Sequence, residues 1–418
     1  MTISVLNIYR DHTELKFFGG ALLNSCINGR NIARRNRAFQ LLAIERLILP
    51  SSDWGRCKKA IQTIKKYPSS QLMRFLDSSS LSAWLDLTTS LLTNRPTWYS
   101  EHYSVWREIS REQLITEQIK YIESKADLLS SVSDFQAKCP TNLEPSQFEI
   151  NADIGIDVWS KPLLANFVGM ETMQRITDIP KLSSYAILLR VAFAHIKTYN
   201  SKINDELNIL VREVVPCCPG IPNIYPSGTS VFTPSAVFIA YTEDVDIAAE
   251  LLIHESGHLK LRVLDAETPI LSVTDQKEQW SSHKWYSPRR DDPRSLMGVV
   301  HSIFVFIEVA NYHLYRVKLD INNHTSHRRL LTLIYQLLEA RKNNPIDSLL
   351  SEQGYMLFRE IDDSLEILVS ALKELPQLKS VEPLHVERHK LWKTPTVSCK
   401  QAAEQHFAWY SENYADLI

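Results

Sequence analysis

Hydrophobic residues recur along most of this chain at the three-and-four spacing of an amphipathic helix, with polar residues between them. In the N-terminal third, Pro50, Pro68 and Pro96 and their serine neighbours separate one helical segment from the next. No residue there indicates catalysis. The predicted helices of this region cover residues 21–48, 53–66, 70–76, 80–93 and 100–134.

The helical pattern loosens between residues 136 and 180, where proline recurs at four positions. Segments of this kind mark domain boundaries, because few contacts cross them. We therefore expect a helical N-terminal region at residues 1–135, which is a candidate for binding a peptide, and a second domain at residues 136–418.

Two apolar runs in the second domain predict strands, one at residues 209–215, ended by Pro216, and one at residues 237–241. If the second strand leads directly into a helix, its edge can accept an extended peptide. The surrounding pattern predicts helices at residues 183–199, 243–264, 295–318, 327–341, 346–376 and 399–415. The expected fold class is therefore mainly α with a small β-sheet (α+β).

Composition argues against several classes of protein. The 46 lysines and arginines nearly balance the 48 aspartates and glutamates, so no overall field favours nucleic acid. The six cysteines are scattered and suit neither a disulfide framework nor a zinc ribbon. The N-terminus lacks a secretory signal, and the longest apolar run, at residues 299–310, is too short to span a bilayer. We expect a cytoplasmic protein without nucleic-acid or membrane partners; its oligomeric state stays open.

The predicted helix at residues 243–264 carries His254, Glu255 and His258 in the pattern His-Glu-x-x-His. Side chains four positions apart lie one above the other on a helix, so both imidazoles can reach one metal ion at roughly 2 Å. Glu255 lies beside them, where it can touch a metal-bound water. Two imidazoles in an apolar helix are costly to bury without a partner, and a cation is such a partner. The alternative is two core histidines hydrogen-bonded to backbone groups.

A third ligand decides the chemistry of such a site. Glu278 follows His258 after nineteen residues, as in one class of zinc peptidases, but Pro269 opposes the helix hairpin which that class uses. Glu308 lies in an apolar helix and is the more credible carboxylate. His301 lies on the same predicted helix, seven residues earlier, and is the stronger third ligand.

A basic loop precedes His301, with arginines at positions 289, 290 and 294. Guanidinium groups bind carboxylates through two parallel hydrogen bonds, so this loop suits a site that holds a small dicarboxylate. A peptidase has no obvious need of three arginines beside its metal. The alternative is that the arginines pair with Asp291, Asp292 and other surface acids.

These residues together resemble the HExxH-motif family of peptide-modification proteins. The resemblance is carried by the segment from Val237 to Lys260 with its His-Glu-Ser-Gly-His motif, by Tyr-Ser-Pro-Arg-Arg-Asp-Asp-Pro-Arg at residues 286–294, and by Gly-Val-Val-His at residues 298–301. The chain departs from the family at Arg289 and Ser295, where members more often have tryptophan and proline. The resemblance covers less than half of the chain and does not extend to residues 1–135.

Members of this family belong to gene clusters for ribosomally synthesised, modified peptides, and some are iron(II)- and 2-oxoglutarate-dependent hydroxylases of a precursor peptide. The resemblance implies that an arginine of the basic loop binds the distal carboxylate of 2-oxoglutarate. Arg294 is the first candidate for this role and Arg290 is the second. Glu255 would orient a ligand or a bound water. The implied iron ligands are His254, His258 and His301.

Three functions agree with the sequence. The first is hydroxylation of a precursor peptide by an iron(II)/2-oxoglutarate-dependent oxygenase in residues 136–418. The second is a zinc metallopeptidase with Glu255 as general base and Glu308 or His301 as third ligand. The third is a non-catalytic peptide-recognition protein that keeps a structural metal. Three observations distinguish these functions. Hydroxylation requires the keto acid, whereas peptide cleavage proceeds without it. Tight metal binding without turnover identifies the non-catalytic protein.

Overall fold

The computed structural model describes residues 17–18, 20–48, 54–66, scattered positions between 72 and 123, and residues 150, 154–156, 176, 178–218, 225–229, 235–272, 285 and 294–374. The chain forms two compact units, Met1–Ser25 with Ala192–Leu207 and Asp244–Ile418, and Cys26–Val191 with Asn208–Glu243. The domain boundary expected near residue 136 and the helix expected at 399–415 lie outside the described residues and stay predictions.

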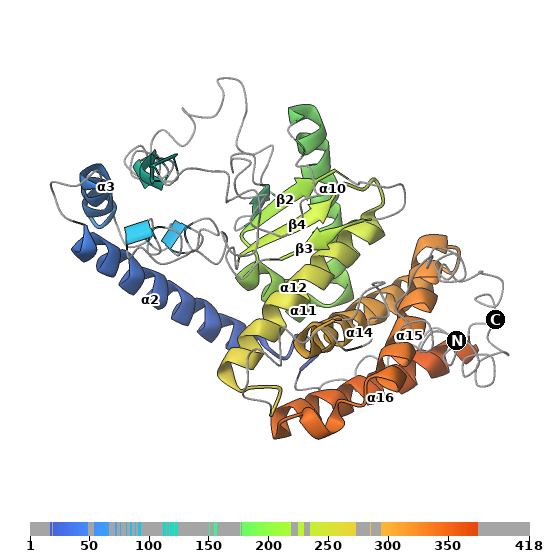
Figure 1. Ribbon diagram of the computed structural model, residues 1–418. Coiled ribbons are helices and arrows are strands. Elements are labelled where there is room, and N and C mark those ends of the chain that lie inside the picture. Colours follow the sequence, from blue (N-terminus) through green and yellow to red (C-terminus); the bar gives the residue numbers. More distant parts are fainter. Residues whose placement is uncertain are drawn as a thin grey trace. The chain divides into compact units, whose positions relative to one another are not determined.

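The unit with residues 208–243 contains the β-sheet. Its strands β1, β2 and β4 run parallel, and β3 is antiparallel to β4. They lie in the order β1-β2-β4-β3, with bounds Gly155–Ile156 (β1), Glu213–Cys217 (β2), Ser227–Gly228 (β3) and Ala236–Ala240 (β4). Figure 1 shows β2, β4 and β3 side by side. All five residues of β4 are buried, as expected for an internal strand. Because most of the other described residues are helical, the predicted fold class, mainly α with a small β-sheet, is confirmed.

Two details of the strand prediction are wrong. Helix α11 (Ser201–Leu210) takes up the first two residues of the strand predicted at 209–215, because an apolar side chain such as that of buried Leu210 suits a helix as well as a strand. The strand continues through Pro216, whose carbonyl accepts a hydrogen bond from Ile176 N (3.1 Å). Strand β4 matches the prediction at 237–241 to within one residue, but β2 and β3 flank it, so the peptide-binding edge expected there is wrong.

Three further predicted helices are confirmed, and most of their residues belong to the same unit. They are α2 (Leu23–Leu47), α3 (Gly55–Ile64) and α10 (Ile179–Tyr199), predicted at 21–48, 53–66 and 183–199. Buried Leu41, Ile44, Ile61 and Ile64 belong to one apolar cluster, which the three-and-four spacing of α2 and α3 produces.

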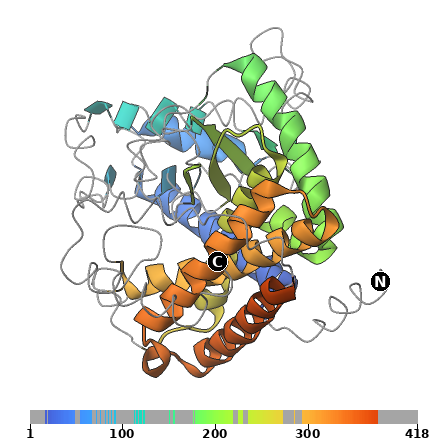
Figure 2. The ribbon, with the colours of Figure 1, turned by 90° about the vertical axis from the view of Figure 1, so that its right-hand side faces the viewer.

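The other unit is built around helix α14. Its helices are α12 (Val245–Glu267), α14 (Leu296–Leu319), α15 (His324–Asn343) and α16 (Glu352–Glu374), with a short 3₁₀ turn at Asp347–Leu349. Helix α14 packs against the other three, and Figures 1 and 2 show it beside α15 and α16. The predictions at 243–264, 295–318, 327–341 and 346–376 are confirmed as helices, with their ends moved by a few residues.

Side-chain caps define where the two long central helices begin. The carboxylate of Asp244 accepts hydrogen bonds from Asp246 N (2.8 Å) and Ile247 N (3.2 Å) at the start of α12. The hydroxyl of Ser295 accepts one from Gly298 N (3.2 Å) at the start of α14. Both caps satisfy donors that a helix leaves unpaired, and each stabilises its helix by about 1 kcal/mol.

Helix α14 extends beyond the apolar run at residues 299–310, which by itself is too short to span a membrane. Among the described residues it is the helix that is long and apolar enough to cross a bilayer, but 94% of that stretch is buried inside the protein. A core helix that is surrounded by other helices has the same composition. Its hydrophobicity is therefore used in packing against α12, α15 and α16.

Candidate metal centre

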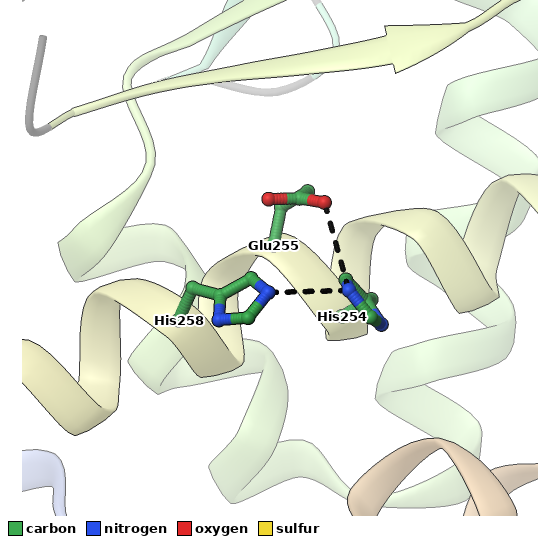
Figure 3. Close-up of side chains that lie close together, drawn as sticks. All are labelled: His254, Glu255 and His258. Carbon is green, nitrogen blue, oxygen red and sulfur yellow. Dashed lines mark hydrogen bonds and ion pairs between the residues drawn. The ribbon is translucent and has the colours of Figure 1, made fainter. Parts of the chain in front are cut away.

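Helix α12 brings His254 and His258 to one face. It is buried along most of its length, so its polar side chains lie in apolar surroundings. The Nε2 atoms of the two histidines are 3.2 Å apart (Figure 3). Two nitrogen ligands at roughly 2.1 Å from one ion, with ordinary angles between them, are about 3.0–3.4 Å apart. The pair therefore fits a shared metal ion as it stands.

The carboxylate of Glu255 faces the same pair. Its Oε1 lies 3.8 Å from His254 Nε2, and its side chain is 1% exposed (Figure 3). One ligand atom from each of His254, Glu255 and His258 lies within 4.8 Å of the other two. A buried carboxylate at this distance can accept a hydrogen bond from a water on the ion or orient a neighbouring ligand.

His301 on α14 also reaches this pair. Its Nδ1 is 3.0 Å from Nδ1 of His258, and the two ring centroids are 5.2 Å apart. The three imidazoles thus form one row with His258 in the middle. His301 lies on the Nδ1 side of His258, whereas His254 lies on the Nε2 side. His301 thus contacts His258 across 43 positions of the sequence; its role as a third ligand stays a prediction.

The close approach of α12 and α14 depends on Gly257. A Cβ atom at this position would lie 2.9 Å from Val305 Cγ1, which is closer than side chains pack. Gly257 therefore lets the two helix backbones come near enough for His258 to meet His301.

We expect Gly257→Val to separate the two helices and to lower stability by about 1–3 kcal/mol, as overpacking does in other cores. Metal affinity should fall with it, because the row of imidazoles is broken. The matched background is Val305→Ala, which removes the clashing methyl. Calorimetric metal titration of both single variants and the double variant checks this, and a double variant as impaired as Gly257→Val would contradict it.

Burial keeps the imidazoles of His258 and His301 neutral. It lowers the pKa of His301 to about 3, helped by the positive charges of Arg262 and Arg294. Burial also lowers the pKa of His258, and the neighbouring imidazoles of His254 and His301 add to this effect. A neutral imidazole keeps a lone pair for a metal, so the site is ready to coordinate an ion at neutral pH.

Arg294 lies two residues before the first residue of α14. Its backbone exchanges two hydrogen bonds with Trp285, N to O in both directions, at 2.8 and 3.0 Å. A Cβ at Gly298 would lie 3.2 Å from Arg294 Nε, so the guanidinium rests against the helix one turn before His301. The second predicted anchor, Arg290, lies outside the described residues.

Glu308, the alternative third ligand, is placed elsewhere. Both of its carboxylate oxygens accept hydrogen bonds from Lys260 Nζ, at 2.6 and 2.7 Å. Lys260 also pairs with Glu206 (2.8 Å), which in turn accepts a hydrogen bond from Leu22 N (2.7 Å). Burial opposes the charge on Lys260, but the two carboxylates outweigh it and raise the pKa of the lysine. Glu308 is thus part of a buried ion cluster and not of the histidine row.

Sequence reasoning also missed a polar network one turn before His254. Glu250 pairs with Arg329 and lies 3.0 Å from Nε2 of His313, both on neighbouring helices. Burial opposes ionisation of Glu250, but Arg329 and His313 lower the pKa of this carboxyl. Its ionised carboxylate therefore links α12 to His313 on α14 and to Arg329 on α15. A charged residue in a largely apolar helix needs a buried partner, so Glu250 itself was the signal in the sequence for this network.

Comparison with known proteins adds no assignment. No known protein family model matches this chain, and no curated protein matches it. The chemistry of the centre therefore has to follow from its own residues.

Proposed function

We propose that this chain is an iron(II)- and 2-oxoglutarate-dependent oxygenase that hydroxylates a side-chain carbon of a ribosomally synthesised precursor peptide in the cytoplasm. The observation that carries the proposal is the row of His254, His258 and His301, with the charge of Arg294 acting on its last two members. A nitrogen-rich site beside a guanidinium suits a metal whose co-substrate is an anion.

The donor set fits the metal at the two histidines of α12, whose Nε2 atoms are 3.2 Å apart. His301 is the third ligand that we propose; it lies on the Nδ1 side of His258, so the imidazole of His258 or of His301 must turn for all three to share one ion. When bound, the iron couples oxidation of the keto acid by dioxygen to hydroxylation of a substrate C–H bond. Arg294 would hold the distal carboxylate of the keto acid, and Glu255 would orient a ligand or a water near His254.

A second candidate is a zinc metallopeptidase. The observation that favours it is the position of Glu255, whose carboxylate is 3.8 Å from His254 Nε2 and could take a proton from a water on the metal. Two arginines whose charges reach the histidines favour the oxygenase, because water-driven peptide cleavage requires no anionic co-substrate.

Anaerobic titration tests the proposal without a peptide. Iron(II) with a chelating keto acid gives a charge-transfer absorption in the visible range, so the protein should develop this band when 2-oxoglutarate is added to its iron(II) form. Mass spectrometry of the small peptide encoded beside this gene, co-expressed with the chain, should then show a gain of one oxygen. Absence of the band together with peptide cleavage by the zinc form would support the peptidase.

Arg294→Ala should raise the concentration of 2-oxoglutarate that half-saturates the protein by about 10- to 100-fold, the worth of a hydrogen bond to a charged group. Iron binding should be unchanged, because Arg294 contributes no ligand atom. Titration of the absorption band measures both. Arg341→Ala, which removes a partly buried arginine paired with Asp362 on another helix pair, is the matched control. Unchanged keto-acid affinity in Arg294→Ala would move the anchor to another residue.

A further inference from the structure

Helix α2 carries a strong excess of positive charge. It contains five arginines and a single acid, Glu45, which pairs with Lys65 (2.8 Å). Three of the arginines have partners within the protein. The side chains of Arg35 and Arg46 are exposed and have no ion pair or hydrogen bond with any residue that the structure describes. These two cations are therefore left to solvent or to a partner.

The exposed face of α2 also carries large apolar side chains. Ile32 is 51% exposed and Phe39 is 63% exposed. Along the helix Ile32 is followed by Arg35 after three residues and by Phe39 after seven, and Arg46 comes seven residues later still. Residues at these spacings lie on one face of a helix. The two apolar side chains and the two arginines thus form one continuous exposed surface.

The opposite face of α2 is anchored in the protein. Leu41 and Ile44 are buried in the apolar cluster that also contains Ile61 and Ile64 of α3. The exposed face is therefore held on a supported helix, so a partner that binds there pays little for ordering the backbone. Arginine and phenylalanine are also among the residues that are enriched in protein interfaces.

This surface fits a peptide with acidic and apolar residues. Guanidinium groups bind carboxylates through paired hydrogen bonds. Ile32 and Phe39 are roughly 10 Å apart along the helix axis, which matches apolar side chains seven residues apart on a second helix. A bilayer favours a wide, uninterrupted apolar face, whereas here arginines interrupt the apolar positions. Nucleic acid requires many phosphate contacts, and the balanced charge of the whole chain adds none.

We propose that the face of α2 formed by Ile32, Arg35, Phe39 and Arg46 is a docking surface for an acidic, amphipathic helical segment of the peptide substrate. The proposal rests on the proposed function, which supplies a peptide as the substrate. It narrows the peptide-binding role expected for residues 1–135 to one face of one helix. A docked segment raises the local concentration of the rest of the peptide at the enzyme.

Fluorescence anisotropy with a labelled synthetic peptide tests the docking surface on the full chain. The probe is a helix of about five turns, roughly 18 residues, that is made of glutamate, alanine and leucine with the leucines on one face. A second probe has glutamine in place of every glutamate. Phosphatidylglycerol vesicles and a short DNA duplex are titrated separately, because they represent the other partners of a basic surface.

We expect the wild type to bind the acidic probe about tenfold more tightly than the glutamine probe. Arg35→Gln combined with Arg46→Gln should weaken the acidic probe by about tenfold, which is the usual size for the loss of charge-assisted hydrogen bonds. Phe39→Ser should weaken it by a similar factor of about ten, because an aromatic anchor is lost. All three positions are exposed, so circular dichroism should show an unchanged fold.

Matched control variants come from exposed positions of α15 and α16. Arg328→Gln combined with Arg359→Gln removes the same amount of charge, and Tyr355→Ser removes an exposed aromatic side chain. These variants should bind the acidic probe as the wild type does. Equal weakening by both arginine pairs, or unchanged binding by Phe39→Ser, would overturn the docking surface. Tighter binding of vesicles or DNA that is lost in the α2 variants would overturn it in favour of that partner.

This assay contains neither iron nor a keto acid. A negative result therefore overturns the docking surface and leaves the oxygenase proposal intact. Absence of the absorption band of iron(II) with 2-oxoglutarate overturns the oxygenase, and the binding result for the peptide then stands by itself.

Discussion

Replacing His258 by alanine is expected to abolish metal binding. His258 is the middle imidazole of the row, with one nitrogen 3.2 Å from His254 and the other 3.0 Å from His301. Its removal takes away a ligand and also the contact that joins the two helices at the site. The loss of affinity should exceed the roughly 10- to 100-fold that follows when only a partner of a ligand is removed. Competition titration with a chromogenic chelator measures it.

The matched control is His324→Ala, because His324 is exposed at the start of α15 and should bind metal as the wild type does. His301→Ala completes the set: if His301 is the third ligand, this variant should also lose metal-dependent activity. Normal metal content in His258→Ala would show that the two histidines of α12 are core residues, which is the alternative that the sequence left open.

Lys260→Met is expected to destabilise the protein by about 3–5 kcal/mol, the usual cost of leaving buried charges without their partner. Lys260 is 2% exposed and pairs with Glu206 and Glu308, which are equally buried. Methionine matches the length of lysine but leaves two carboxyl groups facing each other without a cation. Urea unfolding followed by circular dichroism measures the change in the free energy of unfolding.

Lys202→Met serves as the control, since Lys202 is an exposed lysine on α11 and its loss should change stability by less than about 0.5 kcal/mol. Adding Glu308→Gln to Lys260→Met should recover part of the loss, because one of the uncompensated charges is removed. Equal stability of Lys260→Met and the wild type would mean that the cluster is held by contacts other than its charges.

The helices of the site could be predicted because their signals are local. Asp244 and Ser295 are capping residues at the start of long apolar stretches, and both cap as their positions suggest. The strand predicted at 209–215 was misplaced because a short apolar run such as Ile209-Leu210 occurs both in strands and at helix ends. The sequence pattern alone therefore does not distinguish the two.

The part of the site that the sequence predicts is the part that lies on one helix, where the spacing of residues fixes which side chains meet. Four-residue spacing pairs His254 with His258. Glu308 was considered as a metal ligand because its partner Lys260 lies on another helix, and pairing across helices leaves no pattern in the sequence. His301 was found through the resemblance and its apolar surroundings, and the structure brings it to the row.

The paired backbones of Trp285 and Arg294 have a consequence for how the chain length before α14 can vary. Since the chain leaves and returns at one point, insertions or deletions between these two positions need not move the first turn of α14. Changes in length there, natural or made in the laboratory, can therefore be accommodated while His301 keeps its contact with His258.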